Sequence, residues 1–471
     1  MIDQEIKDLM ISDQEWNSWN SIDQENENPE PLSDDNVRYG NCTWVLGIST
    51  AGHGGSICLI KDQQVVFFLK EERVSRLKRD CDFPFRAIQE VKKYTDSLCL
   101  VVFLNIGGDE RVALLRQLAK ENLKVKDWFD PMEKDQTWKY LYGSSHHINH
   151  ASCGYNLSPF KDATTVVIDG WGWVGAARDL LPSELLHHDC YGSENNELKF
   201  GVRIYEHVSI WKSSEDCDDW KLLYKEVASD WTRNTKLEGT HASVEWVEED
   251  YKDWYETVSG CEDTEIRLVQ PMSVPVCYEA VTCFLGFNQE DVGKTMGLSC
   301  YGKPNEEIPS FIHKDNELKE VSDTVANNIL LNANLYPQLR KYELRRNPSF
   351  QQKADLAYAI QKDLEEKVIC VVERAMRMND CKNIVLSGGV FHNVMINELL
   401  TSKYPDYNFF ADPICDDAGH SFGGAIWYLK ALSGKDFDMR PKSMYLGPSY
   451  LKEELRERVI NAVDKYNCPV L

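Results

Sequence analysis

The alternation of apolar and polar residues predicts several short buried strands near the start of the chain. Residues 43–49, 56–60 and 65–69 are largely apolar, and a glycine-rich turn and a polar turn separate them. We expect these three strands to form a meander. A helix is expected over residues 83–94 and a further strand over residues 98–105, so this region predicts an α/β domain.

The centre of the chain combines a histidine pair with an apolar strand. His146 and His150 are four residues apart, which places both imidazoles on one face of a helix. Residues 163–169 are apolar and β-branched and predict a buried strand that ends at Asp169. Two imidazoles and a carboxylate are typical ligands of a single metal ion. Histidines at this spacing also occur on helix surfaces and in capped cores, so that interpretation stays open.

A glycine-rich junction follows in the last third of the chain. Residues 383–387 predict a strand that leads into Gly388, Gly389 and Val390, and a helix begins near Asn393. Such a junction can present backbone N–H groups and a helix N-terminus to an anion or a nucleotide.

Other segments support this arrangement less strongly. Residues 355–374 predict a long amphipathic helix, and residues 413–424 predict an acidic loop followed by a helix of small residues. Lys294 lies among glycines and could hold a phosphate or an adenine. Its surroundings lack the spacing of a P-loop.

Composition narrows the class of protein. The chain has 471 residues and a formal charge of −24, which disfavours extensive binding to a nucleic-acid backbone but not a nucleotide in an internal pocket. Its 15 cysteines include no C-x-x-C pair, which favours reduced thiols over a zinc ribbon or a disulfide framework. No apolar run is long enough for a membrane helix and the first residues do not form a presequence, so we expect a cytoplasmic protein.

Three polar segments stand out. Residues 1–40 predict an acidic arm, and residues 211–265, dense in Asp, Glu and Trp, predict a helical insertion at the rim of the active cleft. That insertion would serve acceptor recognition, a lid or a dimer contact. Arg73, Lys78 and Arg79 form a basic cluster that would either face solvent or contact an anionic substrate.

The motifs occur in the order of a known family. They are the LGI…H…S corner, EER, HHINHA, IDG, GKTMGLSCYGKP, SGGVFHN and DDAGHSFGGA. With them, the chain resembles the nodulation-type O-carbamoyltransferases, whose large domain is similar to the threonylcarbamoyl-adenosine transferase of tRNA modification. The resemblance implies an actin-like ATPase (ribonuclease-H-like) fold in which two related lobes enclose a nucleotide and metal cleft. It implies lobes over residues 41–210 and 266–443, separated by the insertion, and a remnant or start of a further domain over residues 444–471.

The resemblance also implies the ligands of the site. A divalent metal, iron(II) or otherwise Mn²⁺, Mg²⁺ or Zn²⁺, would be bound by His146, His150 and Asp417, with Asp169 beside them. The residues that would contact ATP are Gly388, Gly389, Val390 and Asn393, with Lys294 and Gly297 nearby.

The implied activity is carbamoyl transfer. Carbamoyl phosphate and ATP yield carbamoyl-adenylate, and a hydroxyl of a small molecule, a sugar or a hydroxymethyl pyrimidine in a nucleotide or DNA then accepts the carbamoyl group. His53 is the first candidate for the base and His147 the second, although a structural role is favoured for His147.

Two departures qualify the resemblance. Gly54 follows His53 where the family has an aspartate, and the domain that forms carbamoyl-adenylate is largely absent. Either a separate subunit would then supply the donor, or the chain is a fragment, or its function has changed. A homodimer is a further expected assembly. The alternatives are a non-catalytic ATP-binding subunit of a carbamoylation complex and a tRNA threonylcarbamoyl transferase, which the lack of an extended basic face disfavours.

Overall fold

The computed structural model describes residues 43–50, 54–78, 80, 83–106, 108–130, 146–177, 202–216, 219–229, 265–268, 274–308, 310–311, 341–342, 346–433, 438–448 and 452–466. The acidic arm expected over residues 1–40 lies outside these ranges, as do His53 and Arg79.

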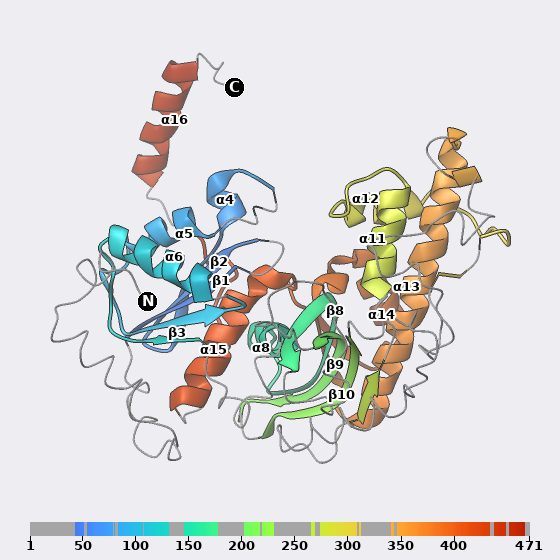
Figure 1. Ribbon diagram of the computed structural model, residues 1–471, viewed down its shortest axis with the longest axis horizontal. Coiled ribbons are helices and arrows are strands. Elements are labelled where there is room, and N and C mark those ends of the chain that lie inside the picture. The colour runs from blue at the N-terminus through green and yellow to red at the C-terminus, as the bar shows by residue number, and fades with distance from the viewer. Residues whose placement is uncertain are drawn as a thin grey trace, which may run out of the picture.

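The first of two central sheets contains the predicted meander (Figure 1). Its strands are β1 (Trp44–Ser49), β2 (Ser56–Lys61), β3 (Gln64–Lys70), β5 (Leu100–Leu104) and β7 (Trp128–Phe129). They lie in the order β3-β2-β1-β5-β7, with antiparallel pairing in the meander and parallel pairing of β1 with β5 and of β5 with β7. The meander is therefore confirmed. A separate two-stranded sheet pairs β4 (Ser97–Leu98) with β6 (Lys124–Val125).

The second sheet repeats the same connectivity. Its strands are β8 (Asp162–Ala177), β9 (Val202–Ser214), β10 (Lys221–Ser229), β11 (Glu265–Leu268), β12 (Asn383–Ser387) and β13 (Asn408–Ala411). They lie in the order β11-β10-β9-β8-β12-β13. Strands β8, β9 and β10 form an antiparallel meander, and β12 and β13 continue parallel to β8. Apart from β11, both sheets therefore have the order third-second-first-fourth-fifth.

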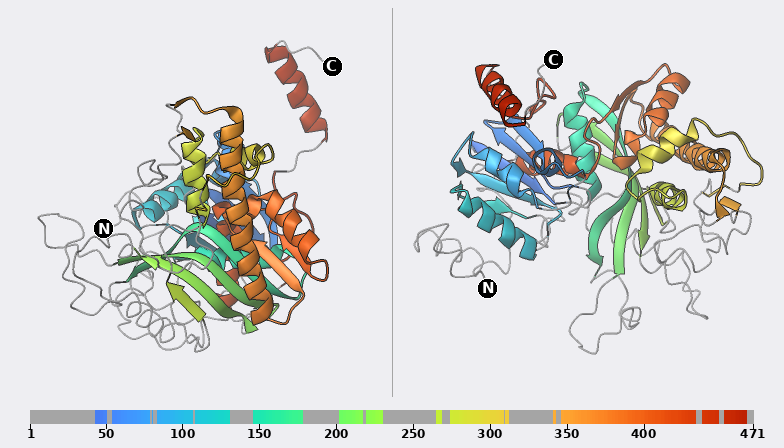
Figure 2. Two further views of the ribbon diagram at one scale, coloured as in Figure 1. Left: turned by 90° about the vertical axis from the view of Figure 1, so that its right-hand side faces the viewer. Right: turned by 90° about the horizontal axis from the view of Figure 1, so that it is seen from above.

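Helices cover the outer faces of both sheets and fill the layer between them (Figure 2). The helices are α4 (Glu71–Ser75), α5 (Phe85–Val91), α6 (Gly108–Lys120), α8 (His146–Leu157), α11 (Val274–Phe284), α12 (Val292–Ser299), α13 (Phe350–Met378), η5 (Gly389–His392), α14 (Val394–Lys403), η6 (Asp417–Gly419), α15 (His420–Ser433) and α16 (Lys452–Tyr466). Helices α5 and α6 pack on the first sheet, and α11, α13 and α14 pack on the second.

The side chains of β1 show why α8 and α15 form the central layer. Leu46 and Ile48 pack into the core formed with α5 and α6, whereas Val45 packs into the core that contains α8 and α15. On β8, Val166 and Ile168 likewise face α11 and α13, and Val167 faces α8. Alternating residues of a strand point to opposite faces, so each sheet is covered on both sides.

Small residues allow the central layer to pack closely. A Cβ on Gly47 of β1 would lie 2.3 Å from the backbone oxygen of Ser421 in α15, and one on Gly423 would lie 2.0 Å from the backbone oxygen of Asn149 in α8. The expected helix of small residues is therefore present as α15, and it packs closely against β1 and α8.

The helical insertion expected from residue 211 is wrong for its first part. Trp211–Ser214 end β9, and residues 221–229 form β10. The expected lobe boundary at residue 210 therefore falls inside a strand, and β8 and β9 of the expected first lobe belong to the second sheet. Buried ion pairs explain part of the misleading polarity, because Lys225 contacts Glu206 at 2.6 Å and Lys367 contacts Glu226 of β10 at 3.1 Å.

Two composition-based expectations can be compared with the structure. Eight of the described cysteines are free thiols, but Cys99 is disulfide-bonded, so the expectation of uniformly reduced cysteines is wrong at that position. None of the helices in the described ranges has the length and hydropathy required to cross a bilayer.

Candidate metal and nucleotide site

Helix α8 brings two histidines into the layer between the sheets. The helix begins at His146, and the predicted spacing places His146 and His150 on one face with their Nε2 atoms 3.2 Å apart. Both imidazoles are buried, with exposed fractions of 5% and 0%. The histidine pair is therefore on a buried helix rather than on a helix surface.

Two carboxylates complete the contacts of this pair. Oδ2 of Asp169, from β8, lies 3.1 Å from Nε2 of His146 and 3.7 Å from Nε2 of His150. Oδ1 of Asp417, the first residue of η6, lies 3.2 Å and 3.5 Å from the same two nitrogens. The structure thus brings together all four residues that the sequence predicted for a metal.

A third imidazole, which the sequence interpretation missed, lies against the pair. His420 is fully buried, and its ring centroid lies 4.1 Å from that of His146 and 4.3 Å from that of His150. His146, His150, Asp417 and His420 each offer one ligand atom, and these atoms lie within 4.8 Å of one another. The three-residue interval between Asp417 and His420 is the only local signal in the sequence, since one helical turn places such residues together.

Burial and the neighbouring charges shift the pKa values of the imidazoles and carboxyl groups in the cluster. Burial lowers the pKa of His146, but Asp417 and Asp169 outweigh this effect and raise it to about 10. The same opposition raises the pKa of His150 to about 9, and it holds both carboxyl pKa values well below their usual range. Burial and the neighbouring imidazoles lower the pKa of His420 far below its usual value. Two buried carboxylates therefore require positive charge beside them.

The donor spacing fits a divalent metal ion. Metal–ligand bonds of about 2.0–2.2 Å place neighbouring donor atoms roughly 3 to 3.5 Å apart. The contacts between imidazole nitrogens and carboxylate oxygens span 3.1 to 3.7 Å. A cation at this point would replace the protons that otherwise balance the carboxylates, and imidazole with carboxylate suits iron, manganese or zinc.

The glycine junction lies directly beside the cluster. Gly388 has a φ of +93°, and a Cβ there would lie 2.4 Å from the backbone oxygen of Ile168, so the turn requires glycine. The N–H of Gly389 donates to Oδ1 of Asp169 at 2.9 Å. Asn393 is the N-cap of α14 and accepts from the N–H of Ile396, while its amide donates to Gln361 at 2.9 Å. Asn393 thus has a structural role in addition to its predicted nucleotide contact.

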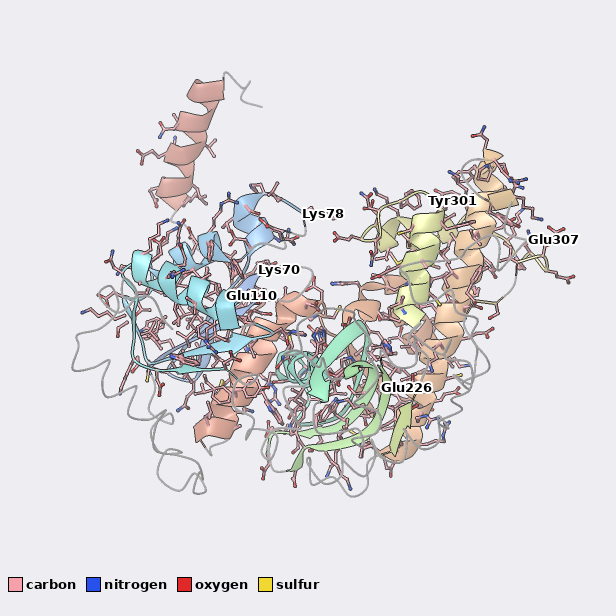
Figure 3. All side chains as sticks on the ribbon, in the orientation of Figure 1. Lys70, Lys78, Glu110, Glu226, Tyr301 and Glu307 are labelled. Atoms are coloured by element: carbon pink, nitrogen blue, oxygen red, sulfur yellow. The ribbon has the colours of Figure 1, made fainter. Side chains whose placement is uncertain are left out.

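Helix α12 carries the second group of predicted nucleotide residues. Lys294 is exposed and forms an ion pair with Asp291 at 2.7 Å. A Cβ on Gly297 would meet no atom within 4 Å, so the helix is open at that residue. Lys78 lies on the side of the first lobe that faces α12 and Tyr301 (Figure 3), and it contributes to lowering the pKa of Asp291 after the larger effect of Lys294. The structure brings Lys78 toward this helix, whereas Arg73 is exposed and contacts Glu72 at 3.4 Å.

His147 lies next to the metal cluster, with its ring centroid 6.1 Å from that of His146 and 6.3 Å from that of His150, but its contacts are with β9. It is fully buried, and its Nδ1 lies 2.9 Å from the hydroxyl of Ser209 on β9. Burial lowers the pKa of His147 to about 3. The carboxylate of Glu206 accepts the backbone N–H of His147 at 2.7 Å and so anchors the start of α8. These contacts favour the structural role expected for His147.

Comparison with known proteins finds similarity to carbamoyltransferases. Residues 237–426 match the family model described as carbamoyltransferase N-terminus. The chain is 23% identical over 420 residues to nodulation protein NolNO of Sinorhizobium fredii, an alignment that covers 85% of this chain and 50% of that protein. A tRNA N6-adenosine threonylcarbamoyltransferase of Nanoarchaeum equitans is 27% identical over 149 residues, or 30% of this chain and 45% of that protein.

A solved structure is also similar. Full-length HypF in its phosphate- and nucleotide-bound form has 14% identity and a TM-score of 0.41, covering 84% of this chain and 56% of that one. The chain spans about half the length of NolNO. Residues 237–426 are therefore similar to the N-terminus of carbamoyltransferases, and most of the chain is distantly similar to nodulation protein NolNO.

Proposed function

We propose that this chain is an O-carbamoyltransferase that moves a carbamoyl group from carbamoyl-adenylate to a hydroxyl acceptor. The carbamoyltransferase N-terminus match supports the class of reaction. The observation that carries the proposal is the buried cluster of His146, His150, Asp169 and Asp417, which has the donor types and the spacing of a divalent metal centre. An ordinary core would gain little from two buried carboxylates and two imidazoles in contact, because their desolvation is costly.

The proposed architecture is that of the actin-like ATPases, with a nucleotide between two related lobes. Its support is the shared strand order of the two sheets, each an antiparallel meander extended by two parallel strands. In such a fold, ligands lie where the parallel strands end. The Gly388 turn directly follows β12, and Asp169, within β8, comes two residues after Val167, the last β8 residue paired with β12. We assign ATP or its adenylate to the Gly388–Gly389 turn, with Lys294 and Gly297 of α12 on the opposite side.

A bound divalent metal would supply Lewis-acid stabilisation of charge on the donor phosphate or the carbamoyl carbonyl. His146, His150 and Asp417 would hold it, with Asp169 at its side. Asp169 also fixes the glycine turn through the N–H of Gly389, so the turn and the cluster keep a constant spacing. The histidine His53 remains the proposed base for the acceptor hydroxyl.

Neighbouring residues would keep the site in place. Lys70, from the end of β3, contacts Oδ2 of Asp416 at 2.6 Å and links the first sheet to the turn that carries Asp417. Figure 3 shows Lys70 on the first lobe, on the side of α15. Glu206 anchors α8 at the N–H of His147. The first contact ties the aspartate turn to the first sheet, and the second ties the histidine helix to the second sheet.

The source of the donor is a separate part of the proposal. Because the chain spans about half of NolNO, we propose that carbamoyl-adenylate comes from another subunit or domain. The test incubates the purified chain with ATP and a divalent metal, with and without carbamoyl phosphate, and measures pyrophosphate. Pyrophosphate release that depends on carbamoyl phosphate would overturn this part, because the chain would then activate its own donor.

A second reaction tests the transfer itself. The chain is supplied with carbamoyl-adenylate and a panel of sugars, small alcohols and hydroxymethyl pyrimidine nucleotides, and mass spectrometry detects a carbamoylated product. Product formation that is lost in His150→Ala supports the proposal. ATP binding without any transfer would instead support a non-catalytic subunit, and modification of tRNA would support a threonylcarbamoyl transferase.

A further inference from the structure

His420 occupies a position that packing alone does not explain. It is the first residue of α15, is fully buried, and lies with its ring edge-on to the rings of His146 and His150. One of its ring nitrogens is within 4.8 Å of the ligand atoms of His146, His150 and Asp417. An apolar residue would fill this space without bringing a polar ring into the core.

The two nitrogens of His420 have different surroundings. Nδ1 is in contact with the side-chain amide of Asn105, whereas Nε2 has no hydrogen-bond partner among the described residues. If the Asn105 amide donates to Nδ1, the proton of the neutral imidazole is on Nε2, where it is a buried and unsatisfied donor. Such a donor is unfavourable, because it has given up its hydrogen bond to water without gaining another.

The opposite amide orientation removes this cost. The oxygen and nitrogen of an asparagine amide can be exchanged by rotation about χ2. The Nδ1–H of His420 then donates to Oδ1 of Asn105, and Nε2 keeps a free lone pair. A buried lone pair beside two imidazoles and a carboxylate is satisfied by a cation. Metal-bound histidines usually donate their second ring N–H to a carbonyl or carboxylate in this way.

We propose that His420 is a further protein ligand of the metal centre through Nε2, and that Asn105 is the positioning residue that fixes its tautomer. This inference rests on the metal centre of the proposed function. It changes the donor set from two imidazoles to three, and imidazole-rich sites select Fe²⁺, Co²⁺ or Zn²⁺ over Mg²⁺, which prefers oxygen ligands.

Asn105 is well placed for this role. It follows β5 directly and has a φ of +55°, a left-handed conformation that asparagine adopts more readily than most residues. Its backbone oxygen accepts from the hydroxyl of Thr50 at 3.3 Å, which holds the residue at the end of the first sheet. Because α8 and β8 supply the other contacts, the metal centre would join the first sheet to the second.

The experiment titrates the full chain, freed of metal by chelation, with Co²⁺ and follows both affinity and the visible absorption spectrum. His420→Phe keeps a ring in the same space without nitrogens. We expect it to weaken Co²⁺ binding at least tenfold and to change the spectrum, and we expect millimolar Mg²⁺ to displace Co²⁺ from this variant more readily than from the wild type. Asn105→Ala should weaken binding by about 10- to 100-fold, and Asn105→Asp should restore it, since a carboxylate also accepts the N–H.

Asn122→Ala is the matched control, because Asn122 has the same left-handed conformation with a φ of +54° and lies outside the site. Circular dichroism checks the fold of each variant. An unchanged affinity and spectrum in His420→Phe would overturn the ligand assignment. An unchanged affinity in Asn105→Ala would overturn the positioning role alone. No Co²⁺ binding by the wild type would instead overturn the metal centre of the proposed function.

Discussion

A single carboxylate, that of Asp169, joins the glycine turn to the histidine cluster. Its Oδ1 accepts the N–H of Gly389 at 2.9 Å, and its Oδ2 lies 3.1 Å from Nε2 of His146. In the proposed function these two oxygens connect the nucleotide turn with the metal ligands. A substitution that removes only one of these contacts can therefore distinguish the effect on nucleotide binding from the effect on metal binding.

Replacing Asp169 by Asn should lower metal affinity and leave the turn intact. The amide oxygen can still accept the N–H of Gly389, but the negative charge beside His146 is lost. We expect metal affinity to fall by about 10-fold or more, as for other groups that support a metal site. Co²⁺ titration and calorimetry with ATP measure the two properties.

Asp169→Ala is the comparison, because it removes both contacts. We expect it to weaken ATP binding as well as metal binding. Wild-type metal affinity in Asp169→Asn would place this carboxylate outside the metal centre, and wild-type ATP affinity in Asp169→Ala would show that the turn does not depend on it.

Two glycines of the predicted nucleotide site should respond in opposite ways to alanine. Gly388→Ala places a Cβ 2.4 Å from the backbone oxygen of Ile168 at a φ of +93°, so we expect strain. The free energy of unfolding of the Gly388→Ala variant should be about 1–3 kcal/mol lower than that of the wild type. Gly297 lies inside α12 with no atom within 4 Å of an added Cβ, so alanine there should stabilise the helix by about 1 kcal/mol. Urea unfolding measures both.

The Gly297→Ala variant also tests the nucleotide assignment. If ATP approaches α12 at this glycine, the added methyl group should weaken ATP binding although the protein is more stable. Equal ATP affinities for Gly297→Ala and the wild type would remove Gly297 from the nucleotide site.

The metal cluster shows which parts of the site were accessible from sequence. His146 and His150 were predicted from their spacing, and Asp169 from an expected strand end, because both signals are local. The expected strand end is wrong, since β8 continues to Ala177. His420 was missed, since its contact with Asn105 joins residues separated by 315 positions. A pattern of neighbouring residues cannot predict a contact between residues so far apart in the sequence.

The second sheet shows why part of the fold was mispredicted. Strand β10 contains Lys225 and Glu226, which are buried and charged, so residues 211–229 were interpreted as part of a polar insertion. Their partners, Glu206 and Lys367, come from other elements. A buried charge is compatible with a core strand only when it is paired, and the sequence does not reveal the pairing.

Asn393 should contribute to stability independently of any nucleotide. Its side chain caps α14 and is hydrogen-bonded to Gln361, so Asn393→Ala removes a cap and leaves a buried amide without this partner. Loss of the cap should lower the free energy of unfolding by about 0.5–2 kcal/mol. Asn393→Ser keeps the capping oxygen and should recover most of that loss.

The pair of Asn393 variants separates stability from binding. If Asn393 contacts the nucleotide, ATP affinity should stay low in Asn393→Ser although stability returns. Recovery of both properties in Asn393→Ser would mean that the asparagine acts only through the helix cap.

Acid should lower the free energy of unfolding by protonating Glu206. Burial raises the pKa of this carboxyl, but Lys225 and the backbone N–H of His147 outweigh that effect and lower it from 4.5 to about 2. The folded state therefore binds fewer protons than the unfolded state over this interval. The resulting stabilisation is fully present above about pH 4.5 and is lost as the pH falls toward 2, for a total of about 3 kcal/mol.

Urea unfolding at a series of pH values between 6 and 2.5 tests this, with the double variant Glu206→Gln/Lys225→Met as the reference. The double variant has no charge at either position, so it avoids the unpaired buried lysine that Glu206→Gln alone would leave. We expect the wild type to lose more unfolding free energy than the double variant across this range, and the difference should develop below pH 4.5. Parallel pH profiles of the unfolding free energy would show that Lys225 does not keep Glu206 ionised. The contact of Glu206 with the N–H of His147 would then not depend on this ion pair.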